Sequence, residues 1–209
     1  MDIMNILVLS DQVSAALWEH FEKSRLDRVD LILACGDLPA EYLSFLATFF
    51  HGPVLYIRGN HDDSYEDHPP EGCICIEDDI YVYRGIRILG LGGSLRYKPG
   101  RNQYTEREMN RRVRRLWLKL HRNKGFDILM THAPAYGIGD GEGAVHTGFL
   151  TFLRLLEKYS PRFFVHGHMH LNYGGSARRL SRYQNTVVVN AFEKFVIEYE
   201  YKYLRIPRL

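Results

Sequence analysis

Short apolar runs that end in a small or polar residue recur along the first part of the chain. They lie at residues 5–10, 29–34 and 53–57. Apolar runs of about five residues are typical of strands that are buried on both faces. Between them, Leu17, Phe21 and Leu26 mark one helix-like stretch, and a second begins after Pro39, a residue type favoured at helix starts. The alternation predicts a β-α-β-α-β unit in which helices cover a parallel sheet.

The rest of the chain continues this alternation of strands and helices. Three strand-like pieces follow one another between Cys73 and Gly93, and the Arg84-Gly85 step predicts a tight turn between the last two. Residues 105–121 are predicted to form one amphipathic helix with an apolar stripe. Another helix is predicted at 149–159, and further strands at 126–130, 162–166, 186–190 and 195–201. No linker interrupts the pattern, so residues 1–209 are predicted to form a single domain.

Almost every predicted strand is followed by a side chain that can bind a metal ion. These side chains are Asp11, Asp37, Asn60, His61, His132, His168 and His170. In open α/β sheets ligands bind at the carboxyl ends of the strands, so these segments can deliver their side chains to one edge. A mixed oxygen and nitrogen set suits Mn, Fe, Zn, Ni or Co rather than Ca or Mg alone. An aspartate between two such metals can bridge them, and a metal pair activates water for in-line displacement at phosphorus.

Each of these residues also has a simpler structural interpretation. Asp11 and Asp37 could cap helices or turns, and Gly59-Asn60 is an ordinary turn signal. His132 taken alone would be a satisfied structural histidine. Their joint occurrence at successive strand ends favours a metal site over coincidence.

Four more residues are candidates for contact with a substrate. His146 lies in a glycine-rich loop just before a predicted helix, where it could face the substrate or simply the solvent. Arg96, Tyr97 and Arg101 lie in a loop that could overhang the site. Arginine suits bidentate phosphate contacts, and tyrosine can stack on a base.

Charge and composition restrict the classes of partner. The chain has 27 Lys and Arg against 25 Asp and Glu, so its net charge gives no general reason to bind nucleic acid. One segment is strongly basic, and its cations are Arg107, Arg111, Arg112, Arg114, Arg115, Lys119, Arg122 and Lys124. They form either a solvated helix face or a surface that holds a polyanion such as RNA or DNA.

Several absences set expectations about location. Three cysteines argue against a disulfide framework, and a reducing cytoplasm is expected. No apolar run approaches the ~18 residues of a membrane span, and the first residues do not resemble a signal peptide. Neither the oligomeric state nor the substrate can be read from these patterns.

Five motifs, in this order and at this spacing, resemble the calcineurin-like metallophosphoesterase superfamily. They are Asp11, Gly36-Asp37, Gly59-Asn60-His61-Asp62, Thr131-His132-Ala133-Pro134 and Gly167-His168-Met169-His170. The resemblance covers roughly residues 5–192. It implies a four-layer α/β/β/α sandwich with mixed sheets, in place of a single parallel sheet. It also implies hydrolysis of a phosphate ester by attack of metal-bound hydroxide.

The resemblance also implies roles for individual residues. Asp37 would bridge two metals, and Asn60, His132 and His168 would complete one site. The ligands of the other site would include Asp11 and His170. His61 would contact the phosphate and protonate the leaving group.

One position departs from the family pattern. The family has a metal-binding histidine two residues after the first aspartate, and this chain has Val13 there. One tight metal site and one weakened site are therefore expected, holding Mn, Fe, Zn or Ni. A phosphodiester is slightly favoured as the substrate because the basic segment suits an extended anion. The alternatives are a nuclease acting on RNA or DNA, and a degenerate metal-binding scaffold without catalysis.

Overall fold

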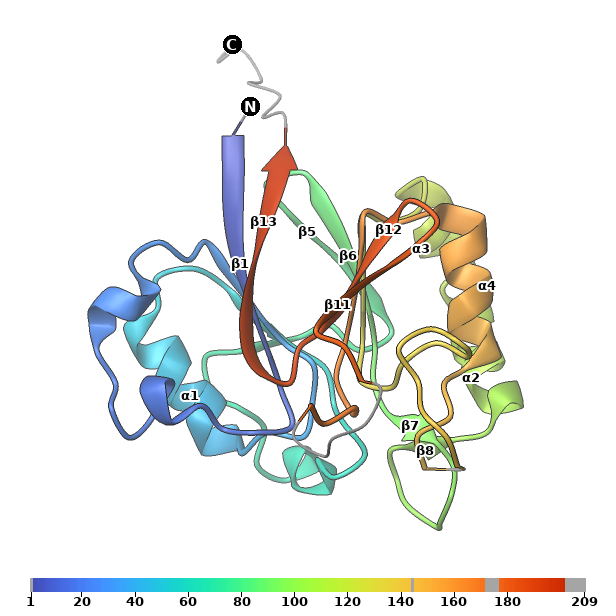
Figure 1. The fold of residues 1–209 in the computed structure, drawn as a ribbon, viewed down its shortest axis with the longest axis horizontal. Coiled ribbons are helices and arrows are strands. Elements are labelled where there is room, and N and C mark those ends of the chain that lie inside the picture. Colours follow the sequence, from blue (N-terminus) through green and yellow to red (C-terminus); the bar gives the residue numbers. More distant parts are fainter. Residues whose placement is uncertain (1, 144, 172–176, 202–209) are drawn as a thin grey trace.

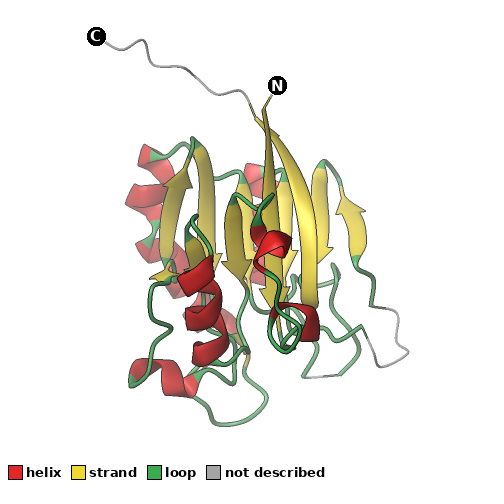
Figure 2. Cartoon of the chain, turned by 90° about the vertical axis from the view of Figure 1, so that its left-hand side faces the viewer, coloured by secondary structure: helices red, strands yellow, loops and turns green. Residues whose placement is uncertain are grey.

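Two β-sheets face each other between two outer layers of helices (Figures 1 and 2). The computed structural model describes residues 2–143, 145–171 and 177–201. The four-layer α/β/β/α arrangement with mixed sheets implied by the sequence motifs is confirmed. Among the described residues, no helix is long and apolar enough to cross a membrane.

The first sheet has the strand order β13-β1-β2-β3-β4. Its strands are β1 (Asp2–Ser10), β2 (Leu31–Ala34), β3 (Val54–Tyr56), β4 (Ile74–Cys75) and β13 (Glu193–Tyr201). The strands β1 to β4 are parallel, as the alternating pattern predicted. The last strand, β13, runs antiparallel to β1 along its whole length.

The second sheet has the order β11-β12-β10-β9-β6-β5. Its strands are β5 (Asp79–Tyr83), β6 (Ile86–Leu91), β9 (Ile128–Thr131), β10 (Phe163–His166), β11 (Leu180–Tyr183) and β12 (Thr186–Asn190). The four central strands are parallel, and the edge strands β5 and β11 are antiparallel to their neighbours. The short strands β7 (Ser94–Leu95) and β8 (Gln103–Tyr104) pair separately.

Three apolar clusters hold the layers together. Between the sheets, strand residues such as Val8, Leu33 and Met130 are fully buried. On the outer face of the first sheet packs α1 (Ala40–Phe49), and on that of the second pack α2 (Glu106–Arg115), α3 (Trp117–Arg122) and α4 (Leu150–Tyr159). Because the central strands are apolar on both faces, they contribute side chains both to the cluster between the sheets and to the clusters under the helices.

Two helix predictions were wrong in detail. The segment between β1 and β2 forms two single 3₁₀ turns, Ala15–Leu17 and Lys23–Leu26, in place of a continuous helix. Nearby, Trp18 and Phe21 pack edge-on against Phe45 of α1, so aromatic contacts hold this segment in place of helical hydrogen bonds.

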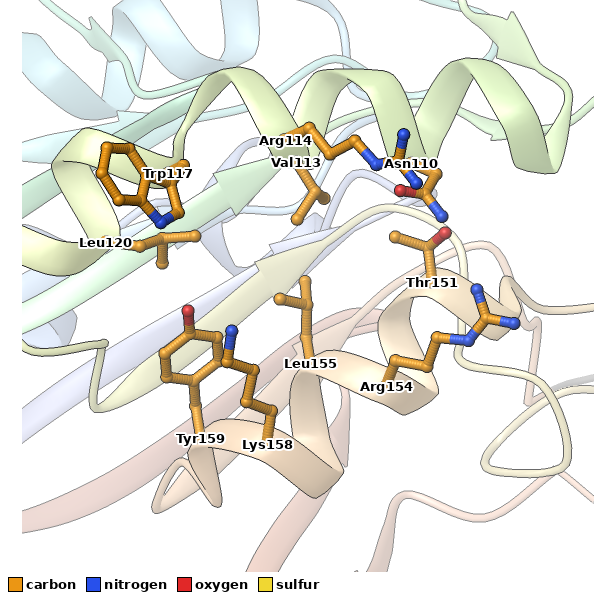
Figure 3. Close-up of a pocket in the computed structure, with 10 residues that line it drawn as sticks. All are labelled: Asn110, Val113, Arg114, Trp117, Leu120, Thr151, Arg154, Leu155, Lys158 and Tyr159. Carbon is orange, nitrogen blue, oxygen red and sulfur yellow. The ribbon is translucent and has the colours of Figure 1, made fainter.

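The helix predicted at 105–121 is broken. At Leu116 the backbone turns with ψ near 0°, and its N–H bonds the carbonyl of Val113, three residues back. The break gives α2 and α3, both of which face α4 across a groove (Figure 3). Both Leu116 and Leu120 stay buried against the second sheet, which explains why the chain changes direction there.

Candidate metal centre

The predicted strand-end residues meet at one edge of the two sheets. Asp11 follows β1, Asp37 lies three residues beyond β2, and His132 follows β9. The two sheets are connected there, because both carboxylate oxygens of Asp11 accept from the backbone N–H of His168, at 3.1 and 2.9 Å. The side chains delivered by separate strands therefore share one edge, as predicted.

The glycines of the motifs are required by close backbone approach. A Cβ on Gly36, which has φ +91°, would lie 2.3 Å from the amide nitrogen of Gly59. A Cβ on Gly59 would lie 2.1 Å from Oδ1 of Asp37. A side chain at either position would thus push the strand ends apart and displace Asp37.

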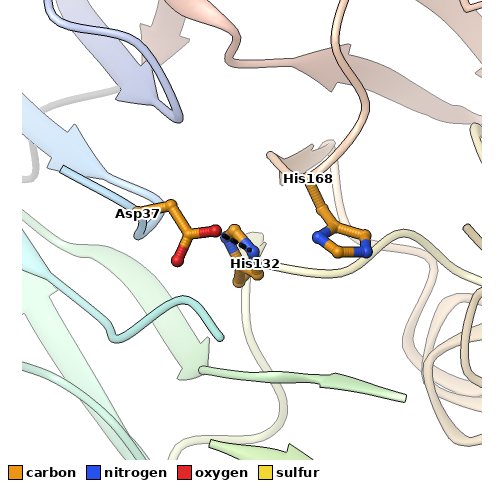
Figure 4. Close-up of side chains that lie close together, drawn as sticks. All are labelled: Asp37, His132 and His168. Carbon is orange, nitrogen blue, oxygen red and sulfur yellow. Dashed lines mark ion pairs between the residues drawn. The ribbon is translucent and has the colours of Figure 1, made fainter. Parts of the chain in front are cut away.

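The centre of the site is formed by His132, Asp37 and Asn60. His132 is fully buried, and its Nδ1 lies 2.8 Å from the carbonyl oxygen of Cys35. Because a carbonyl only accepts, Nδ1 carries a proton and donates it. The other ring nitrogen, Nε2, lies 3.0 Å from Oδ1 of Asn60 and 3.3 Å from Oδ2 of Asp37 (Figure 4). Without a proton on Nε2, this nitrogen and the two oxygens would direct lone pairs at one another. Nε2 must therefore carry a second proton or bind a metal cation.

The charge balance of this pair favours a cation. Burial lowers the pKa of His132, but the charge and the hydrogen bond of Asp37 raise it to about 10. Burial likewise raises the pKa of Asp37, but His132 and the N–H of His61 outweigh it and bring it to about 2. A buried carboxylate beside an imidazole stabilises positive charge between them, and a divalent cation would replace the proton on Nε2.

His168 adds a further nitrogen ligand. Its Nε2 lies 2.7 Å from the carbonyl oxygen of Val145, so Nε2 donates and Nδ1 keeps its lone pair. Burial and the charge of His132 lower the pKa of His168 to about 3, so the ring is neutral. Ligand atoms of Asp37, His132 and His168 all lie within 4.8 Å of one another. This mixed donor set fits a divalent transition metal.

Sequence reasoning gave no role to Asp62, the last residue of the Gly-Asn-His-Asp motif. It is buried, and its Oδ2 accepts from the N–H groups of Asp37 and Gly59, both at 2.7 Å. Burial and the charge of Asp37 raise its pKa to about 6. Asp62 therefore ties together the two turns that carry Asp37 and Asn60. The acid in the motif was the available signal, but its partners are backbone groups 25 and 3 residues away.

The residues predicted for a second metal are more loosely arranged. Nε2 of His170 lies 3.8 Å from Oδ1 of Asp11. Burial raises the pKa of Asp11. Val13, which stands where the family has a histidine, packs against the apolar cluster between the first sheet and α1.

The predicted substrate-contacting residues are only partly brought to the site. The hydroxyl of Tyr97 accepts from Nδ2 of Asn60 at 3.4 Å, which places this tyrosine at the centre. His146 lies near His168, and their ring centroids are 6.2 Å apart. Arg96 pairs with Glu108 at 2.9 Å, and Arg101 pairs with Glu66. Both arginines therefore hold the loop in place and are not free to meet a phosphate.

One cation of the basic segment does not belong to a solvated face. Arg112 is buried, and its guanidinium bonds Glu77 at 2.8 Å, Asp78 at 2.9 Å and the carbonyl oxygen of Gly92 at 2.9 Å. It also lies over the ring of Tyr104, 4.3 Å from its centroid. Arg112 fits neither alternative for the basic segment, because it is buried and its guanidinium is already paired with acids 34 and 35 residues away in sequence.

Carboxylate, amide and imidazole groups gathered at one edge of a two-sheet sandwich are typical of metal-dependent hydrolases. More particularly, the calcineurin-like phosphoesterase family matches residues 4–172, and the chain belongs to this family. It is thus a phosphoester hydrolase with a divalent metal cofactor.

Solved structures agree with this fold. TT1561 of Thermus thermophilus is 17% identical, with a TM-score of 0.63 over 92% of this chain and 90% of that chain. The 5'-nucleotidase from Candida albicans SC5314 is 12% identical, with a TM-score of 0.51 over 90% of this chain and 45% of that chain. At such identities the likeness concerns the fold alone. A search of curated proteins gave no match.

Proposed function

We propose that this chain hydrolyses a phosphodiester, with Asp37, Asn60, His132 and His168 holding one divalent metal ion and His61 acting on the leaving group. One observation carries the proposal. The hydrogen bond from Nδ1 to the carbonyl oxygen of Cys35 fixes the ring of His132, so that Nε2 faces the two oxygen ligands of Asn60 and Asp37. A scaffold without chemistry has no physical need for a buried imidazole in that orientation.

The bound metal would supply the charge that lowers the pKa of water and neutralises the phosphoryl oxygens. The side chains supply position and proton transfer. Two hydrogen bonds hold Asp37. Its backbone N–H donates to Oδ2 of Asp62, and its Oδ1 accepts from the backbone N–H of His61. These bonds fix the carboxylate before any substrate arrives.

His61 is the side chain best placed to donate a proton. Its backbone is bonded to Asp37 at 2.8 Å, whereas its own side chain is exposed at the edge of the site. An imidazole there can reach the oxygen of a leaving group and protonate it as the bond to phosphorus breaks.

Asp11 and His170 would contribute to a second, weaker metal position together with Asp37. Its weakness follows from Val13, whose apolar side chain offers no ligand atom and packs against the α1 cluster. Asp11 is, in addition, already engaged by the N–H of His168. We expect one equivalent of Mn, Fe, Zn or Ni to be held tightly and a second to be lost on dialysis.

The preference for a diester rests on charge. A diester carries one negative charge and a monoester near neutral pH carries about two. Because Arg96 and Arg101 are paired with acids of this chain, neither is free to stabilise the additional charge of a monoester. Tyr97 and His146 lie at the site and can contact the ester substituents.

The test compares bis(p-nitrophenyl) phosphate with p-nitrophenyl phosphate in the presence of each metal. The proposal predicts faster turnover of the diester. His61→Ala should retain its metal and lose about 10²–10⁴-fold in kcat. The loss should be larger for a diester with a phenolate leaving group, which needs a proton more than nitrophenolate does. His51→Ala removes an exposed histidine elsewhere and serves as the control.

Two results would contradict the proposal. Turnover of neither ester with Mn, Fe, Zn or Ni would remove the catalytic assignment. An equal loss for good and poor leaving groups in His61→Ala would remove the role of His61 as the acid.

A further inference from the structure

A groove runs between α2–α3 and α4 on the outer helix layer (Figure 3). We call it the α2–α4 groove, and its floor is formed by Val113, Leu120 and Leu155. Its cavity volume is about 350 Å³. No candidate site residue lines it, so it is a feature separate from the metal centre.

The groove follows the helix axes. Its lining positions on α4 run from Thr151 to Tyr159, and those on α2–α3 run from Asn110 to Leu120. At 1.5 Å per residue the α4 side is about 12 Å long, which is roughly two turns of a helix. Trp117 and Tyr159 stand at one end (Figure 3), and Trp117 is 63% exposed. An elongated apolar floor with an exposed tryptophan is the form of surface that receives the apolar face of a helix.

The rim of the groove is positively charged. Arg114, Arg154 and Lys158 line it and are exposed. Within the part of the chain that the structure describes, none of the three forms an ion pair with an acid, and no acidic residue lines the groove. The cations of this rim are therefore available to an external anion, in contrast to Arg112 on the same helix.

We propose that the α2–α4 groove binds an amphipathic helical segment of a partner protein, with apolar residues at i, i+3 and i+7 and carboxylates beside them. The apolar residues would cover Val113, Leu120 and Leu155. The carboxylates would meet the three rim cations. A helix of this kind is complementary to the groove in both respects, since its apolar residues match the floor and its carboxylates match the rim.

Other anions fit the groove less well. Nucleic acid would meet the cations but has no aliphatic surface to cover the floor. A membrane is flat, and a concave floor between two helices would not reach into it. Both remain measurable outcomes of the experiment.

The experiment measures binding of a fluorescein-labelled peptide by anisotropy to the full chain. The peptide has about 14 residues, long enough to form helix on binding, with Leu at i, i+3 and i+7, Glu beside each Leu and Ala elsewhere. The variant Arg114→Glu/Arg154→Glu should weaken binding at least about tenfold, which corresponds to about 1.4 kcal/mol. A peptide with Lys in place of Glu should bind this variant better than it binds the unmodified chain.

The matched control is Arg115→Glu/Arg122→Glu. It changes the net charge by the same amount as the rim variant does. Its two positions lie on α2 and α3, are exposed and do not line the groove. Its effect should be less than about twofold, since exposed charges at a distance are screened. Trp117→Ala should weaken binding without changing the charge. All variants should hydrolyse bis(p-nitrophenyl) phosphate like the unmodified chain, so the result is independent of the proposed function.

Three outcomes would overturn the inference. Equal weakening by the two double variants would indicate non-specific attraction. Failure of the Lys peptide to bind the reversed rim would exclude the assigned charge contacts. Absence of peptide binding, with single-stranded DNA or phosphatidylserine vesicles bound in its place, would assign the surface to another class of partner.

Discussion

Asp62 should control metal affinity without touching the metal. Its Oδ2 is the only acceptor, within the described residues, for the buried N–H groups of Asp37 and Gly59. Those two groups begin the turns that present Asp37 and Asn60. Replacing Asp62 with Ala removes both hydrogen bonds, whereas Asn offers one carbonyl oxygen in the place of Oδ2 and keeps them.

The magnitude follows from the two N–H groups. Leaving one buried donor without a partner costs about 1–3 kcal/mol, so Asp62→Ala should lower the free energy of unfolding by about 2–6 kcal/mol. Removing a group that orients ligands typically costs about 10–100-fold in metal affinity. Asp62→Asn should come close to the unmodified chain in both the free energy of unfolding and the metal affinity. It loses the negative charge but retains the two hydrogen bonds from the backbone.

Urea denaturation and calorimetric titration with Mn²⁺ measure the two quantities separately. Asp67→Ala removes an exposed acid of the same segment and should change neither by a measurable amount. Diester hydrolysis adds a third readout, since at saturating metal Asp62→Asn should have the kcat of the unmodified chain and Asp62→Ala should stay below it. If Asn and Ala variants lost equal metal affinity, the negative charge of Asp62 and not its hydrogen bonds would be responsible, and this reasoning would be refuted.

Three further predictions concern other parts of the molecule. Arg112→Ala should cost about 3–5 kcal/mol in urea denaturation because Glu77, whose side chain is 11% exposed, loses its partner, whereas the exposed Arg111→Ala should cost little. Gly59→Ala should abolish retention of metal on dialysis, since its Cβ would lie 2.1 Å from Oδ1 of Asp37, and Gly85→Ala, with open space around it, should retain metal. Removal of metal by a chelator should lower the free energy of unfolding, and metal added back at about 100 times its Kd should restore about 2.7 kcal/mol. A chelated protein with unchanged stability would contradict a metal bound within the folded site.

Much of the fold could be predicted because apolar runs of the central strands are local signals. The strands that end before Asp11, Asp37 and His132 were recognised from a few residues each, and the rule that ligands collect at carboxyl ends brought the three together. The helix break at Leu116 could not be predicted in this way. It depends on how Leu116 and Leu120 meet the second sheet, and nothing in the local pattern differs from a continuous helix.

Charged side chains were interpreted less successfully, and the reason is physical. A sequence shows that Arg96, Arg101 and Arg112 carry charge, but not whether an acid neutralises each of them. Their partners lie 12, 35 and 35 residues away along the chain, as measured to Glu108, Glu66 and Glu77. Local charge density therefore overestimates the charge available to a substrate, and only the folded chain separates paired cations from free ones.

The orientation of the metal ligands lies furthest from the sequence. The motifs identify His132 and His168 as candidate ligands. Which ring nitrogen of each can bind a metal depends on the backbone carbonyl that accepts from the other nitrogen. The carbonyl of Cys35 takes the Nδ1 proton of His132, and that of Val145 takes the Nε2 proton of His168. Every residue has a carbonyl, so no side-chain pattern marks these two, and the opposite nitrogens of two similar histidines are left free. Ligand identity is thus encoded locally, whereas ligand direction is encoded by the path of the whole chain.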